Sequence, residues 1–237
     1  MRGDRANGSA MPEPAVGFVR SWARGLTWRP RRPGALRGRS IGRPVGAPVL
    51  ETERLTLRSY RASDEDDWFR LHQGHGVREF LAWPDRNRQQ ARAHLRVRMR
   101  SKILHRADDF MALALELDGR VIGDISLHLR AVASEVRGVE VGWVLHPDFQ
   151  GKGYATEAAA AVARFAFEAV RARMVFAVVD PRNRESFRLA RRLGFVEMSR
   201  RGRGGLLLLT EDALVLAPGR AHAEPQPIST CDLSKAT

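Results

Sequence analysis

Two alternating runs of apolar residues on either side of Asp118-Gly119 restrict the fold of this chain most strongly. Residues 110–117 and 120–129 both alternate in the manner of β-strands, and Asp-Gly between two such runs favours a tight hairpin turn. Strands joined by so short a turn pair antiparallel. The sequence therefore predicts that an antiparallel sheet forms the centre of the fold.

Helices are expected on both sides of this hairpin. Ser63 precedes four acidic residues, which is typical of a helix start, and Gly74 marks the end of that helix. Residues 87–104 carry apolar side chains at four-residue spacing, which indicates an amphipathic helix. Two later helices are expected over residues 154–170 and 183–193.

Strands alternate with these later helices. The expected strands cover, in order, residues 55–58, 110–117, 120–129, 139–145, 174–179, 195–198 and 206–216. Early helices, a hairpin and then a strand–helix–strand order predict one mixed α/β (α+β) domain over residues 48–217. Residues 218–237 contain few core-forming side chains, so we expect them to be a C-terminal tail.

Positive charge is concentrated at the N-terminus. The chain has a net charge of +13, to which residues 1–47 contribute +8 through ten arginines and two acidic residues. These residues show no sustained apolar period, so we expect a disordered Arg/Pro/Gly-rich segment. A misassigned start codon, a basic arm that binds nucleic acid or the ribosome, and an arginine-rich transit peptide are the alternatives.

Length and composition exclude several classes of protein. A chain of 237 residues can bury a core without disulfides, and the single cysteine, Cys231, leaves neither a disulfide framework nor a multi-cysteine zinc site. No run reaches the roughly 18 apolar residues that a membrane span needs. The histidines lack clustered acidic partners, so we expect no metal, and we expect a cytoplasmic protein.

A glycine-containing turn, residues 150–155, links an expected strand to an expected helix. Gly151 and Gly153 allow the backbone to come close to a ligand, and Lys152 adds a positive charge. The following helix offers free N–H groups and a positive dipole end, which suit a pyrophosphate. The spacing matches neither a Walker A motif nor a dinucleotide fingerprint. A tight turn that binds nothing is therefore the alternative.

Several short motifs follow one another in a fixed order along residues 50–217. They are Leu50–Arg58, Phe80-Leu81-x-Trp83-Pro84, Val121-Ile122-Gly123, Val139–Pro147, Gln150–Ala158, Asn183-x-x-Ser186 and Leu193-Gly194-Phe195. In this order they resemble the GNAT superfamily of acyl-CoA-dependent N-acyltransferases. The nearest resemblance is to its RimJ/RimL-type branch, which acetylates protein N-termini among other amines.

The resemblance implies a particular sheet and a place for acetyl-CoA. The sheet would be mixed, mostly antiparallel, with six to seven strands, flanked by about four helices and splayed between the fourth and fifth strands. The backbone of Val144 and Leu145 would pair with the pantetheine arm in that opening, and Asn183 would contact pantetheine. The residues implied to hold the phosphates are Gln150, Gly151, Lys152, Gly153, Tyr154, Ala155 and Thr156.

Catalysis in such a site is direct attack of an amine on the thioester. Glu140 is the candidate base, since strand alternation places it on one face with Gly142 and Val144. A structural glutamate paired with arginine is the alternative. The family's usual tyrosine acid is replaced by Ala190, so Ser186 is the candidate proton donor. A first-turn hydroxyl that only bonds the backbone is the alternative for Ser186.

The acceptor is expected to be a protein or peptide N-terminal α-amine, such as that of a ribosomal protein. An α-amine has a pKa near 7.7–8.0 against about 10.4 for lysine, so a weak base suits it better. Residues 62–104, which carry charges of both signs, would form the acceptor wall, and Trp83 would line it. A small-molecule (aminoglycoside or polyamine) N-acetyltransferase and a non-catalytic CoA- or ribosome-binding module are the alternatives. We expect a monomer or homodimer.

Overall fold

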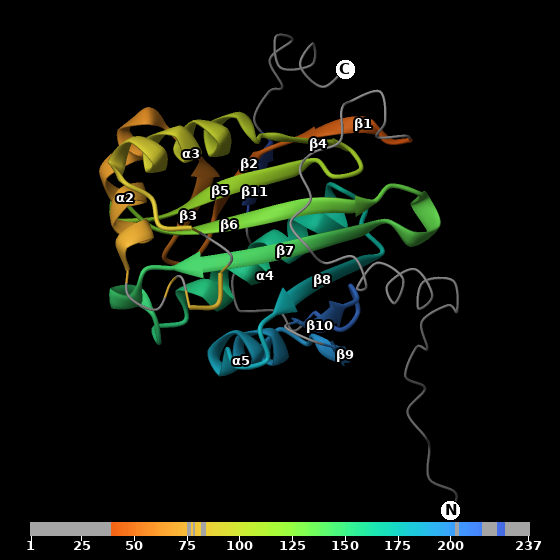
Figure 1. The fold of residues 1–237 in the computed structure, drawn as a ribbon. Helices are drawn as coiled ribbons and strands as arrows, with labels where there is room; N and C mark the ends of the chain where they lie inside the picture. The colour runs from red at the N-terminus through yellow and green to blue at the C-terminus, as the bar shows by residue number, and fades with distance from the viewer. Residues whose placement is uncertain are drawn as a thin grey trace, which may run out of the picture. The chain divides into compact units, whose positions relative to one another are not determined.

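The computed structural model describes residues 39–74, 77, 79–81, 84–201, 204–214 and 222–225. A nine-stranded sheet dominates this part of the chain (Figure 1). Its strands lie in the order β11 (His222–Pro225), β2 (Pro48–Glu51), β3 (Thr56–Ser59), β5 (Phe110–Leu117), β6 (Arg120–Ala131), β7 (Gly138–Leu145), β8 (Met174–Val179), β10 (Gly204–Leu209) and β9 (Val196–Arg201).

The pairing in this sheet is antiparallel at every step except one. Only β7 and β8 run parallel, and α4 (Tyr154–Glu168) connects them. The predicted hairpin is present, because Leu117 pairs with Arg120 across Asp118-Gly119. The mixed, mostly antiparallel sheet is therefore confirmed, although it has nine strands where six to seven were expected.

The two additional strands of this sheet are β2 and β11, and a separate two-stranded ribbon was also not expected. β1 (Ser40–Gly46) pairs with β4 (Ile103–Arg106) in a separate ribbon, although residues 1–47 were expected to be disordered. β11 pairs with β2, although residues 218–237 were expected to be a tail. Both predictions are wrong at these residues, because backbone pairing at a sheet edge needs no long apolar pattern. The rest of both segments beyond residues 39–47 and 222–225 lies outside the described residues.

The four expected helices are present. They are α2 (Glu65–Gln73), α3 (Arg88–Arg100), α4 and α5 (Arg184–Arg192), with short 3₁₀ turns at Ala62–Asp64, Ser134–Val136 and Pro147–Phe149. α3 begins at a capping box, in which Asn87 accepts from the Gln90 N–H and the Gln90 side chain accepts from the Asn87 N–H. α3 ends four residues earlier than expected, since Ile103 lies in β4. None of the helices in the described ranges is long and apolar enough to cross a membrane.

The helices cover the two faces of the sheet separately (Figure 1). α4 packs its buried alanines, valine and phenylalanines against one face, together with the apolar side chains of β5 to β8 and β10. α2 and α3 lie over the other face and bury a smaller cluster around Trp68 and Tyr60. In β7, Val139 and Val141 join the α4 side and Val144 joins the α2–α3 side, so the expected alternation of β7 is confirmed.

A buried ion pair fixes the start of α2 on the sheet. The guanidinium of Arg58 donates to both carboxylate oxygens of Asp64, each at 2.9 Å, and its Nε donates to Glu116 at 2.6 Å. Arg58 is 4% exposed and Asp64 is 5% exposed. Asp64 also accepts from the backbone N–H of Arg61 at 2.7 Å. The last arginine of the Leu50–Arg58 motif therefore ties β3 to the helix that follows it.

We expect Gly194→Ala to lower the free energy of unfolding by about 3 kcal/mol or more, since it combines left-handed strain with a backbone clash. Gly194 ends α5 with a φ of +93°, and a Cβ there would lie 1.9 Å from the Ala213 carbonyl oxygen. Gly119→Ala is the matched control. Its φ is +77° but a Cβ would meet no atom within 4 Å, so a loss of only about 1 kcal/mol is expected. Equal losses in urea denaturation would contradict this account.

Candidate active site

The parallel pairing of β7 with β8 stops after three residue pairs. Gly138, Val139 and Glu140 pair with Met174, Val175 and Phe176, and no further β7–β8 pair is present in the described strands. Beyond Glu140 the two strands diverge (Figure 1). This is the predicted splay between the fourth and fifth expected strands, and it is confirmed. The edge of Val141–Leu145 that faces the opening is left with backbone groups that an extended ligand can pair with.

The glycine-containing turn lies at the end of the splayed half of β7. Gly151 and Gly153 have φ values of +76° and +85°, a region that other residues rarely adopt, and Gly153 is the N-cap of α4. The first bond of the helix runs from the Glu157 N–H to the Gly153 carbonyl at 3.0 Å. The N–H groups of the three residues between them therefore have no acceptor within the helix. Such a turn can hold an anion by its main chain.

Two side chains of this turn donate to backbone carbonyls that lie just before it in the chain. The Gln150 side-chain amide donates to the Leu145 carbonyl at 3.0 Å. The Lys152 ammonium donates to the Asp148 carbonyl at 3.1 Å and lies 5.6 Å from the centre of the Phe149 ring. The backbone amides of the turn, rather than these two side chains, are thus the groups best placed to meet phosphates. The predicted phosphate-binding roles of residues 150–156 and the pantetheine roles of Val144 and Leu145 stay predictions.

Glu140 lies at the last paired position of β7, where the opening begins. Its Oε2 accepts from Arg130 Nε at 2.9 Å, and Arg130 also lies 3.3 Å from an Asp108 oxygen. The Glu140 side chain is 17% exposed. Burial raises the pKa of Glu140, and the Arg130 charge and hydrogen bond oppose that shift. The structure thus contains the arginine pair that was the alternative, at a half-buried carboxylate whose pKa lies above the ordinary value.

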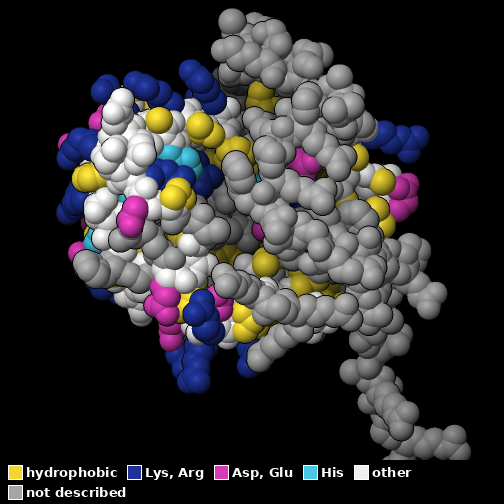
Figure 2. Space-filling model, in the orientation of Figure 1, with side chains coloured by type: hydrophobic (Ala, Val, Ile, Leu, Met, Phe, Trp, Pro, Cys, Tyr) yellow, Lys and Arg dark blue, Asp and Glu magenta, His cyan; other side chains and the backbone are white. Residues whose placement is uncertain are grey.

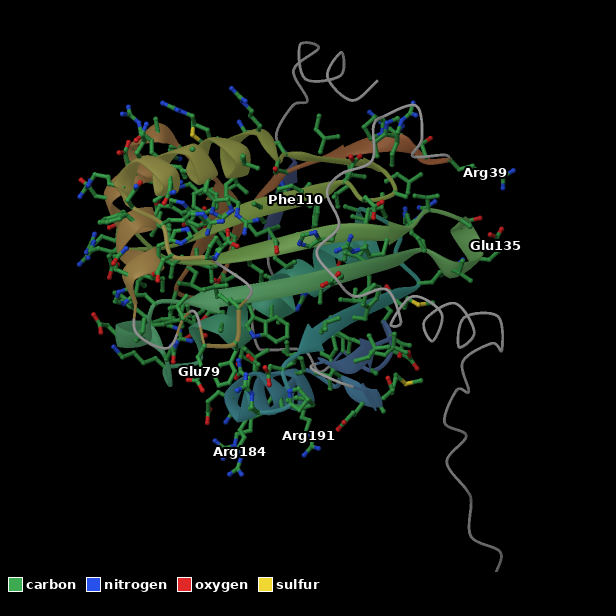
Figure 3. The ribbon with its side chains drawn as sticks, viewed as in Figure 1. Arg39, Glu79, Phe110, Glu135, Arg184 and Arg191 are labelled. Atoms are coloured by element: carbon green, nitrogen blue, oxygen red, sulfur yellow. The ribbon has the colours of Figure 1, made fainter. Side chains whose placement is uncertain are left out.

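His128 lies directly opposite Glu140 on β6 and was missed by the sequence analysis. Its Nε2 is 3.2 Å from Ser126 Oγ, and its ring stacks on Phe110, which Figure 3 labels, at 5.4 Å. Burial and the neighbouring Arg130 charge lower the pKa of His128 to about 3. Alternation along β6 was the signal available, because Ser126, His128 and Arg130 share one face. This polar row continues the face of Glu140.

Ser186 approaches the other face of β7. Trp143 Nε1 donates to Ser186 Oγ at 3.2 Å, while the backbone N–H of Ser186 donates to Asn183 Oδ1 at 3.0 Å. Asn183 is therefore the N-cap of α5, as expected, and Ser186 lies in the first turn of that helix. Because the Ser186 oxygen accepts from Trp143, its proton is available to a further acceptor. Glu140 and Ser186 lie on opposite faces of β7, one on each side of the opening.

Trp83, the residue expected to line the acceptor site, lies outside the described residues.

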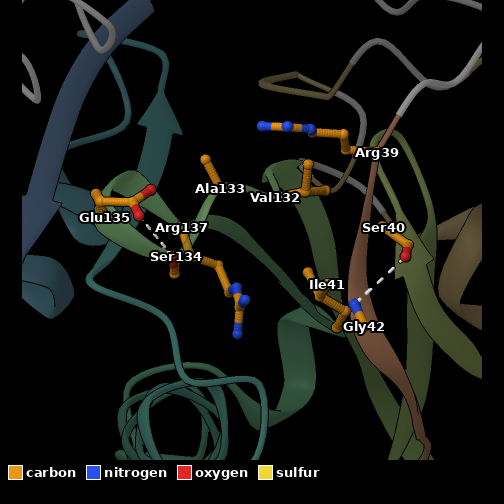
Figure 4. Close-up of a pocket in the computed structure, with 9 residues that line it drawn as sticks. All are labelled: Arg39, Ser40, Ile41, Gly42, Val132, Ala133, Ser134, Glu135 and Arg137. Carbon is orange, nitrogen blue, oxygen red and sulfur yellow. Dashed lines mark hydrogen bonds between the residues drawn. The ribbon is translucent and has the colours of Figure 1, made fainter.

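A cavity of about 300 Å³ lies between β1 and the turn after β6, lined by residues 39–42, 132–135 and Arg137 (Figure 4). None of the candidate site residues lines this cavity, so it is separate from the opening between β7 and β8. Among the described residues, no three His, Cys, Asp or Glu side chains gather as a metal site requires.

Comparison with known proteins identifies the family of this chain. Residues 54–196 match the family model of the acetyltransferase (GNAT) domain. The chain belongs to the GNAT acetyltransferase family. It is accordingly an acetyl-CoA-dependent N-acetyltransferase, and the resemblance found in the sequence is confirmed.

Individual relatives support the family and differ in how much they cover. An uncharacterized N-acetyltransferase, p20, of Bacillus licheniformis is 28% identical over 148 residues, which cover 62% of this chain and 82% of that protein. The uncharacterized N-acetyltransferase YnaD of Bacillus subtilis (strain 168) is 38% identical over 55 residues, and this match spans 23% of this chain and only 32% of YnaD. The solved structure of RimL, a ribosomal L7/L12 alpha-N-protein acetyltransferase, in complex with coenzyme A has the same fold, with a TM-score of 0.58, 16% identity and coverage of 70% of this chain and 99% of RimL.

Variants of Asn183 can separate its capping role from contact with coenzyme. We expect Asn183→Ala to lower the free energy of unfolding by about 1 kcal/mol, because the bond from the Ser186 N–H is lost. Asn183→Asp keeps that acceptor and should unfold like the wild type. If the Asn183 amide also donates to pantetheine, both variants raise the KM for acetyl-CoA. Identical stability of the two variants in urea denaturation would contradict the capping role.

Proposed function

We propose that this GNAT enzyme acetylates the α-amine of protein or peptide N-termini in the cytoplasm. The observation that carries the proposal is the half-buried carboxylate of Glu140 at the start of the splay, with Arg130 as its partner. A carboxylate here can take the proton of an amine that attacks the thioester in the opening. The RimL fold, found in an enzyme that acetylates an α-amine of a ribosomal protein, supports the same choice of acceptor.

The strength of this base favours an α-amine over lysine. Burial raises the pKa of Glu140, while Arg130 stabilises its charged form and limits the increase. At pH 7.4 about a quarter of an α-amine is already neutral, against about one in a thousand lysine side chains. For an α-amine the carboxylate therefore only has to take the proton released as the neutral amine attacks, whereas for lysine it would also have to overcome a pKa near 10.4.

The coenzyme would lie along the opening, with its reactive end beside Glu140. The pantetheine arm would pair with the free backbone edge at Val144 and Leu145, and the pyrophosphate would meet the amides of residues 150–156. Only the eight residues from His146 to Gly153 separate the end of β7 from the start of α4, so one extended molecule can use both the strand edge and the helix N-terminus. This order of groups places the thioester near the closed end of the splay.

Ser186 would protonate the leaving thiolate. Trp143 holds its oxygen at 3.2 Å, and the first turn of α5 fixes its backbone. A thiol has a pKa of only about 8.5, so the thiolate also leaves without help. The contribution of Ser186 is therefore smaller than that of Glu140.

The surface over α2 and α3 argues against a polycationic acceptor. Lys or Arg and Asp or Glu side chains are interspersed there (Figure 2). Arg88 pairs with Asp66, and Arg92 pairs with Glu65 at 3.0 Å. Aminoglycosides and polyamines carry several positive charges and would need a mainly acidic wall. The small-molecule alternative therefore has less support than a peptide.

Replacing Glu140 should change both the rate and its pH dependence. We expect Glu140→Gln to lower kcat/KM for an N-terminal peptide about 100-fold at pH 7.4, because the base is lost. At pH 9 the rest of the α-amine is neutral as well, which can recover at most about fourfold of this deficit. The measurement is thiol release from acetyl-CoA with a pool of peptides between about pH 6 and about pH 10.5, which spans the pKa values of an α-amine and of lysine.

Glu168→Gln is the matched control, because Glu168 is exposed at the end of α4. It should leave kcat/KM unchanged at every pH. An undiminished rate in Glu140→Gln would refute Glu140 as the base. A rate in the wild type that keeps rising steeply above pH 9 would instead identify a lysine-like acceptor.

Intact-mass analysis of cellular proteins with and without this enzyme tests the acceptor class directly. We expect one or more proteins to lose an N-terminal acetyl group when the enzyme is removed. If only aminoglycosides or polyamines are acetylated by the purified protein, the small-molecule alternative is correct. If coenzyme A binds and no amine in either set is turned over, the chain is a non-catalytic binding module.

A further inference from the structure

The loop between β2 and β3 binds the first turn of α4, about one hundred residues later in the chain. The Thr52 hydroxyl donates to Glu157 Oε1 at 2.6 Å, and the Arg54 backbone N–H donates to the same oxygen at 2.8 Å. Arg54 Nε donates to Glu157 Oε2 at 2.8 Å, and Arg54 Nη2 lies 2.6 Å from that oxygen. Both oxygens of Glu157 are therefore engaged by two residues of one loop.

Arg54 also reaches the coenzyme turn itself. Its Nη1 donates to the Lys152 carbonyl at 2.9 Å, and its guanidinium carbon lies 4.5 Å from the centre of the Tyr154 ring. A single side chain thus contacts the turn before the helix, the first helical residue and the carboxylate one turn later. These contacts hold Lys152 and Tyr154 on either side of Gly153, whose φ is +85°. The loop that carries Arg54 is itself held by a bond from the Leu55 N–H to the Thr52 hydroxyl at 3.0 Å.

Electrostatics gives these contacts a second consequence. Glu157 lies in the first turn of α4, beside the amides that would receive a pyrophosphate. Burial raises the pKa of Glu157, but the bonds from Thr52 and Arg54 outweigh burial and lower it, so the carboxylate stays ionised. An unbalanced negative charge at this place would repel the phosphates of the coenzyme. The guanidinium of Arg54 balances it.

We propose that Arg54 is a positioning residue for acetyl-CoA, which holds the turn in its anion-binding form and cancels the charge of Glu157. It acts through Glu157 and the Lys152 carbonyl, without touching the coenzyme. This inference rests on the proposed binding of the pyrophosphate by residues 150–156. It also explains why the Thr52-x-Arg54 and Tyr154-Ala155-Thr156-Glu157 motifs occur together in one chain, since each supplies half of one contact.

Binding of coenzyme A measured by titration calorimetry tests the proposal without an acceptor. We expect Arg54→Gln to raise the Kd for coenzyme A at least tenfold. The double variant Arg54→Gln/Glu157→Gln should regain at least threefold, because the uncompensated carboxylate is gone. A purely structural role would not give this recovery, since removing the second partner cannot restore the lost contacts. Arg88→Gln is the matched control, because it breaks the ion pair between Arg88 of α3 and Asp66 of α2 and should leave the Kd unchanged.

The outcomes separate the two levels of the proposal. Wild-type protein that binds pantetheine as tightly as coenzyme A would refute the pyrophosphate site itself. A clear preference for coenzyme A, together with a Kd for Arg54→Gln within threefold of the wild type, would refute the role of Arg54 alone. A double variant no tighter than Arg54→Gln would refute charge cancellation. A melting temperature in the absence of coenzyme A accompanies each titration, and a folded Arg54→Gln protein is required for the comparison.

Discussion

The short parallel pairing of β7 with β8 is the constraint on which the rest of the site depends. Three residue pairs hold the strands together at one end, and α4 connects them across the back of the sheet. Past Glu140 the two strands separate, while the other edge of β8 pairs with β10 in an antiparallel ladder of five residue pairs. A sheet that closed fully would leave no free backbone edge beside Val144. A sheet that opened earlier would lose the fixed position of Glu140.

The two faces of β7 have different chemistry, and the difference suits a reaction in the gap. On the α4 side, Val139 and Val141 are part of the large apolar core. On the other side, Glu140 continues a polar row with His128 and Arg130 of β6. His128, with its pKa lowered to about 3, stays neutral near pH 7 and adds no charge to this row. The charge balance around Glu140 is therefore set by Arg130 and Asp108.

The splayed strand pair was implied only by the family resemblance. Local patterns in the sequence were enough for the hairpin, the four helices and the caps at Asn183 and Gly194. Each of these depends on residues within a few positions of one another, which is the range over which periodicity and capping act. The contacts of Arg130 with Glu140, and of Arg54 with Glu157, join side chains that no local rule connects. β1 and β11 were missed for the same reason, because their partners lie far along the chain.

The buried alanines of α4 give the sheet a second influence on the coenzyme site. Ala158 to Ala161 and Ala163 are between 0% and 5% exposed, and those that face the strands keep the layer between this helix and the sheet thin. Because α4 packs closely on the sheet, a larger or smaller side chain in that layer shifts the whole helix relative to the strands. The distance between α4 and the sheet therefore sets the position of the backbone amides that follow Gly153 relative to β7. Substitutions at these buried positions, which lie away from the bound coenzyme, can therefore change the affinity for it.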